Sequence, residues 1–177
     1  MTSTVQSQNS NMSLDQDEEK KQYDIYLYDG KEPLYNINDI TLYQNLSGYI
    51  SVFVNDIKDQ KIILPDFVKE REMNLIIEFI EAYSKTMNYK LNMLENKYKI
   101  NIEKPVRDIS TFKKEVGDCY EVIEKIFSQK LFLSVINTAM CLDITILFDI
   151  ICAKIALDIK YMTRSEMNDY FNEAKSK

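Results

Sequence analysis

The chain has 177 residues, of which 28 are acidic and 22 basic, and it contains no histidine. Its length suits one domain with appendages, and 45% hydrophobic residues suffice for a sizeable core. The lack of histidine excludes Ser-His-Asp and Cys-His nucleophilic sites and every zinc site that needs an imidazole. The three glycines lie too far apart for a phosphate-binding loop. We therefore expect a binding protein, with no catalytic residue, cofactor or metal.

The cysteines and the charge pattern indicate where such a protein works. The chain has three cysteines, Cys119, Cys141 and Cys152, an odd number at wide spacing that does not fit a disulfide framework. We therefore expect buried free thiols in a reducing compartment. The net charge of −6 argues against nucleic-acid binding. Charged residues interrupt the most apolar stretch, residues 131–159, which argues against a membrane span. A cytoplasmic or nuclear location follows.

The N-terminal part predicts a tail and two strands. Residues 1–22 are rich in Ser, Asn, Gln and acidic side chains, so we expect a disordered tail. Residues 23–28 alternate between apolar and polar side chains, as a half-buried strand does. Asp29-Gly30 predicts a hairpin turn, and a second strand fits residues 34–37.

Helical and extended patterns then alternate. Apolar residues at helical spacing predict a short helix over residues 40–46, which Gly48 would end. Residues 61–64 predict a third short strand, which the proline that follows would end. A helix is expected over residues 73–83. Residues 85–109 fit a mobile, lysine-rich insertion better than a basic binding patch.

The C-terminal part predicts helices throughout. Thr163-x-x-Glu166 is a capping box, so a last helix begins there and carries Tyr170 and Phe171. The helix around residues 147–159 is apolar on nearly every face, and such a helix is either fully buried or keeps one face for a partner. Both alternatives stay open from the sequence. This helix is expected over residues 146–159. Two further helices are expected over residues 112–127 and 131–140, with a break at 142–144 before the helix of residues 146–159.

Three motifs stand in register in the last third of the chain: Leu-Asp-Ile at 142–144, Asp-x-x-Cys at 149–152 and Thr-x-x-Glu at 163–166. With their neighbours, they make residues 132–171 resemble, without gaps, the dimerisation region of the Skp-type F-box adaptors. The first part of the chain resembles this family more weakly, so the resemblance covers roughly residues 23–172.

The resemblance implies a fold and a function. The fold would be α/β (α+β): a BTB/POZ-type domain over residues 23–127, with a small three-stranded sheet, flanking helices and the insertion at 85–109. Residues 128–177 would form the Skp-type dimerisation and F-box-binding helices. The protein would be a non-catalytic adaptor that links F-box or leucine-rich-repeat partners to a cullin in an SCF-type ubiquitin ligase.

The resemblance also assigns two surfaces. Met140 and Cys141 stand where the family has an Asn-Tyr pair that faces the cullin. The F-box face would comprise Leu147, Ile151, Cys152, Ile155, Ala156, Ile159, Met167 and Phe171.

Two departures from the family pattern support an alternative. Replacing the aromatic residue of the Asn-Tyr pair by Cys141 removes an anchor of the kind that dominates interfaces. The chain also stops shortly after Phe171, where the family continues with segments that wrap the F-box, so we expect a smaller binding area. The alternative is a structural subunit of a non-ligase assembly, such as a ciliary, axonemal or kinetochore-like complex, that keeps F-box or leucine-rich partners. Homodimerisation through the Tyr- and Phe-rich first half also stays open.

Overall fold

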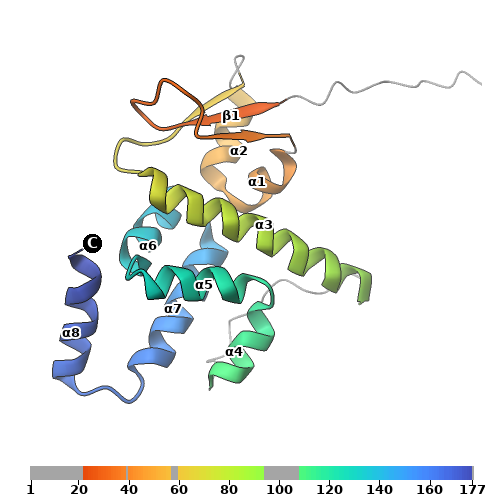
Figure 1. Ribbon diagram of the computed structural model, residues 1–177. Helices are drawn as coiled ribbons and strands as arrows, with labels where there is room; N and C mark the ends of the chain where they lie inside the picture. Colours follow the sequence, from red (N-terminus) through yellow and green to blue (C-terminus); the bar gives the residue numbers. More distant parts are fainter. Residues whose placement is uncertain (1–21, 39, 57–59, 94–107, 177) are drawn as a thin grey trace, which may run out of the picture.

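The computed structural model describes residues 22–38, 40–56, 60–93 and 108–176 (Figure 1). Within these ranges the chain forms eight helices and one three-stranded sheet, so the expected mixed α+β class is confirmed. The predicted N-terminal tail lies almost wholly outside the described residues. None of the helices in the described ranges combines the length and the apolar character needed to cross a membrane.

The three predicted strands form one sheet in the order β2-β1-β3. Strand β1 (Tyr23–Tyr26) pairs antiparallel with β2 (Tyr35–Ile37) and parallel with β3 (Lys61–Ile63). The alternation predicted for β1 is present, because its first and third residues are buried and the others half-buried. The predicted turn closes through a hydrogen bond from the Gly30 N–H to the Leu27 carbonyl at 3.0 Å, but the connection to β2 is longer than a two-residue hairpin.

Two helices, not one, lie between β2 and β3. Helix α1 (Ile40–Leu46) is the predicted one, but Gly48 does not end a helix: it begins α2 (Gly48–Asp56). Ser47 caps α2, because its Oγ accepts a hydrogen bond from the Ile50 N–H at 3.2 Å. The prediction that Gly48 serves as a helix stop was therefore wrong.

The long helix α3 (Glu70–Met93) crosses the molecule between the sheet and the C-terminal helices (Figure 1). It contains the predicted helix of residues 73–83 and continues through residues 84–93, so the first part of the predicted lysine-rich insertion is helical. The middle of that insertion, residues 94–107, lies outside the described residues.

The periodic stretch of residues 112–127 forms two helices, α4 (Ile109–Val116) and α5 (Cys119–Ser128). Gly117 separates them with a φ of 63°, a conformation that glycine adopts without strain. A Cβ atom at Gly117 would lie 3.0 Å from the Thr86 side chain, so the close packing of this turn on α3 also favours glycine.

The C-terminal helices follow the prediction closely: α6 (Phe132–Cys141), α7 (Thr145–Ile159) and α8 (Arg164–Lys175). The hydrophobic core runs without a break from the sheet through α3 to these helices, with fully buried Ile25, Phe79 and Phe132 among its members. The predicted division at residues 127/128 falls within this continuous core.

Candidate partner-binding surface

One row of side chains anchors α7 in the core. Leu147, Ile150 and Ile151 have no exposed surface, and Lys154 in the same row is 7% exposed. Leu147 and Ile151 belong to the predicted F-box face, but in the structure they are core residues that a partner cannot touch. They shape the candidate surface only from beneath.

The neighbouring flank of α7 is open. Cys152, Ile155 and Ile159 are partly exposed and follow one another at spacings of three and four residues, so they share one side of the helix. Ala156 is exposed farther round the helix. Burial is the main cause that raises the pKa of the Cys152 thiol, and the nearby Asp149 carboxylate raises it further. The thiol therefore stays protonated and behaves as a small apolar group. Four predicted residues thus remain available on α7.

The start of α8 is defined by the predicted capping box, which is confirmed. The Thr163 side chain accepts a hydrogen bond from the Glu166 N–H, and the Glu166 carboxylate accepts one from the Thr163 N–H at 2.7 Å. Met167 and Phe171, both partly exposed, then lie four residues apart on one side of α8.

Aromatic stacking fixes α8 on the molecule. The Phe171 ring meets Phe132 of α6 edge-on with 6.2 Å between ring centroids, and Tyr170 stacks on Phe132 at 5.0 Å. Lys130 also forms an ion pair with Glu173 at 3.1 Å. The Tyr170 hydroxyl donates a hydrogen bond to Asp158 of α7 at 3.2 Å, so the C-terminal half of α7 and α8 lie together. We refer to Cys152, Ile155, Ile159, Met167 and Phe171 as the α7–α8 surface.

A second exposed group lies at the end of α6. Met140 is 60% exposed and Cys141 is also exposed, so the prediction of a buried thiol was wrong for Cys141. Cys119 is buried as expected, and Cys152 is partly exposed. Cys141 is exposed because it lies in the last turn of α6, on the side away from the core.

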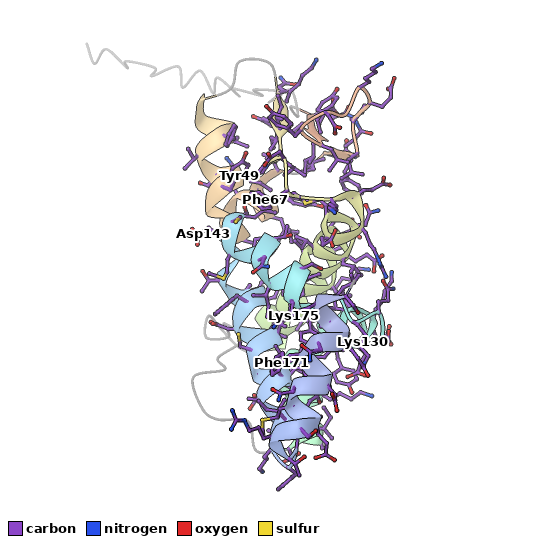
Figure 2. All side chains as sticks on the ribbon, turned by 90° about the vertical axis from the view of Figure 1, so that its left-hand side faces the viewer. Tyr49, Phe67, Lys130, Asp143, Phe171 and Lys175 are labelled. Atoms are coloured by element: carbon purple, nitrogen blue, oxygen red, sulfur yellow. The ribbon has the colours of Figure 1, made fainter. Side chains whose placement is uncertain are left out.

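The turn after Cys141 docks on the start of α2. The Ser47 hydroxyl donates to the Leu142 carbonyl at 2.6 Å, and the Gly48 N–H donates to the Asp143 carbonyl at 3.3 Å. A Cβ atom on Gly48 would lie 2.1 Å from Asp143 Oδ2, so any larger residue there would force the Asp143 side chain to move. The turn that follows Met140 and Cys141 therefore lies against the start of α2. Figure 2 views the molecule from the side of α8, where Asp143 and Tyr49 lie above Phe171.

Several residues of these sites were missed from the sequence. Ser47 and Gly48 gave no signal for their contact with the 142–144 turn, because that contact joins residues far apart in the chain. Lys154 and Asp158 carried a signal, an oppositely charged pair four residues apart in an apolar helix.

Comparison of the chain with known proteins finds no match: no family model, no curated protein and no solved structure matches it. Among the described residues, no group of three or more Cys, Asp or Glu side chains is arranged to hold a metal ion. The geometry offers shaped apolar surface on α7 and α8, flanked by paired charges.

Proposed function

We propose that this protein is a non-catalytic adaptor of the Skp type with a BTB/POZ-type fold. It binds F-box partners through the α7–α8 surface and links them to a cullin in a ubiquitin ligase. The order of its parts supports this proposal, since a small sheet with flanking helices precedes the C-terminal helices whose motifs resemble the family. The observation that carries it is the open apolar flank of α7, in register with the resemblance, beside an α8 that begins at the expected capping box.

The energetics favour a helical, leucine-rich partner. Burying one large aliphatic side chain contributes about 1.5–3 kcal/mol, so a few contacts to Ile155, Ile159 and Phe171 can dominate the binding free energy. An amphipathic helix presents apolar residues at the spacing of three and four that this flank of α7 also has. F-box and leucine-rich-repeat proteins are partners of this chemistry.

The exposed end of α6 supports the second candidate function. Met140 and Cys141 occupy the positions that the resemblance assigns to the cullin contact, and neither is a large aromatic anchor. A structural subunit of a ciliary or kinetochore-like assembly would keep the α7–α8 surface and have no need of that contact. The two candidates therefore share F-box binding and differ in the cullin.

The test is affinity purification of the full chain from its own cells, with F-box proteins and cullins scored separately by mass spectrometry. The variant is Ile159→Asp, chosen because Ile155 also packs against the core. The matched control is Tyr28→Asp, which places the same charge on a side chain that is 69% exposed and belongs to the sheet end of the molecule.

We expect Ile159→Asp to reduce F-box recovery at least tenfold and Tyr28→Asp to leave it unchanged. Cullin recovered together with the F-box proteins supports the ligase adaptor, and F-box proteins recovered reproducibly without cullin support the structural subunit. Equal recovery by the wild type and Ile159→Asp contradicts the assignment of the surface.

A further inference from the structure

Lys154 is an unusual member of α7, because it is a charged side chain that is only 7% exposed. Among the described residues, only two ionisable acidic or basic side chains are buried, Glu72 and Lys154. Burial of an ammonium group is unfavourable unless close partners compensate for the lost hydration. The partners of Lys154 therefore explain how the sequence tolerates it.

Those partners come from two helices. Both Asp158 carboxylate oxygens accept hydrogen bonds from Lys154 Nζ, at 2.7 and 2.9 Å. Glu124 of α5 lies 3.6 Å from the same nitrogen, and the Phe127 ring centroid of α5 lies 4.8 Å from it. Lys154 thus fixes Asp158 in one orientation and ties this part of α7 to α5.

Asp158 has a further partner on α8. Its Oδ2 accepts the hydrogen bond from the Tyr170 hydroxyl at 3.2 Å. The Tyr170 ring stacks on Phe132 and meets its neighbour Phe171 edge-on, with 5.2 Å between centroids. Burial, followed by the charge of Asp158, raises the pKa of Tyr170, so the hydroxyl keeps the proton that it donates.

We propose that Asp158 is a positioning residue for the α7–α8 surface: held by Lys154, it fixes Tyr170 and so sets where α8 presents Phe171 and Met167. The effect of Asp158 on partner binding rests on the proposed function, because that function requires the two halves of the α7–α8 surface to keep their spacing. The contacts of α8 with α6 are ring contacts, and the Tyr170–Asp158 hydrogen bond adds a directional contact between α8 and α7.

The other side of the Lys154–Asp158 pair faces a hollow. This hollow of about 440 Å³ lies between α4, α5 and α7, and both members of the pair line it. The pair is therefore not sealed by packing, and water can reach the carboxylate when Tyr170 leaves it. We therefore expect loss of the Tyr170–Asp158 hydrogen bond to affect α8 locally and to leave the core of α3 and α5 intact.

The experiment uses hydrogen exchange of the full chain with Tyr170→Phe, which removes the hydroxyl and keeps the ring. We expect the α8 amides to exchange about tenfold faster, the effect of losing a hydrogen bond to a charged group, with exchange in α3 and α5 unchanged. The matched control is Tyr49→Phe, which removes a hydroxyl that donates to the Ile63 carbonyl at 2.8 Å in the other part of the molecule. This control should leave α8 exchange unchanged.

Titration with a recombinant F-box domain as the probe then tests the consequence. We expect Tyr170→Phe to weaken binding about tenfold and Tyr49→Phe to leave it unchanged, although both remove one hydroxyl. Unchanged α8 exchange overturns the inference, and so does faster α8 exchange with unchanged F-box affinity. If the wild-type chain binds no F-box domain, the proposed function fails, and the positioning role stands or falls on the hydrogen exchange alone.

Discussion

The two ends of α7 are attached to the molecule in different ways. At its N-terminal end, the turn of residues 142–144 docks on α2 through backbone carbonyls, which accept hydrogen bonds from Ser47, Gly48 and Tyr49. At its C-terminal end, α7 meets α8 through side chains, chiefly the hydrogen bond between Tyr170 and Asp158.

This difference separates a fixed junction from an adjustable one. At the α2 junction the hydrogen bonds end on backbone carbonyls, and the Asp143 side chain lies so close to Gly48 that a Cβ atom there would overlap it. The α8 junction depends on side chains, so its geometry is kept only while contacts such as the Tyr170–Asp158 hydrogen bond are made. We infer that the α2 junction orients α7 and that the α8 junction, while the Tyr170–Asp158 hydrogen bond is made, sets the spacing of the two halves of the α7–α8 surface.

The largest expected effect is at the adjustable junction. Phe132→Ala removes a fully buried ring that stacks on Phe127 and Tyr170 at 5.0 Å each. We expect a loss of about 3–5 kcal/mol in the free energy of unfolding, measured by urea titration, because both the buried ring and its stacking are lost. Tyr28→Ala is the control, since its ring is exposed. A loss below about 1 kcal/mol would mean that α8 and α6 are not packed as described.

A smaller effect tests the fixed junction. Gly48→Ala places a Cβ atom 2.1 Å from Asp143 Oδ2, so the Asp143 side chain must move, and we expect a loss of about 1–2 kcal/mol in urea titration. Adding Asp143→Gly to Gly48→Ala should recover the lost stability, because it removes the overlapping carboxylate. Glycine also suits the φ of 52° at position 143. If Gly48→Ala costs the same with and without Asp143→Gly, the close approach does not govern this junction.

The sequence predicted more of the helices than of their junctions. The periodic apolar residues of α6, α7 and α8 and the Thr163 capping box are local signals, and each was confirmed. The role of Gly48 was misjudged, because the feature that requires glycine there is Asp143, far away in the chain. The resemblance placed Leu147 and Ile151 on the binding face, whereas the structure buries both, and a helix that is apolar all round does not show which side is buried.

The smallest effect concerns the pH dependence of the start of α8. The Glu166 carboxylate accepts hydrogen bonds from the backbone N–H and the hydroxyl of Thr163. Both lower the pKa of Glu166, the backbone N–H more than the hydroxyl. Because the folded value lies below the unfolded one, this contribution is complete above the unfolded pKa and is lost as the pH falls through the folded value. We expect the first turn of α8 to fray on acidification below the usual glutamate range, measured by hydrogen exchange or NMR.

Glu166→Gln is the control for this titration, since glutamine keeps a capping oxygen but carries no titrating carboxyl. Its first turn should show no such acid transition. Identical acid fraying in the wild type and Glu166→Gln would show that another group controls this end of α8.

We propose that an F-box partner binds at the open flank of α7. The most direct measurement is the amount of F-box protein recovered with the full chain from its own cells, compared between the wild type, Ile159→Asp and Tyr28→Asp. We expect at least a tenfold loss for Ile159→Asp alone. Equal recovery with all three chains, or no F-box protein with any of them, would contradict it.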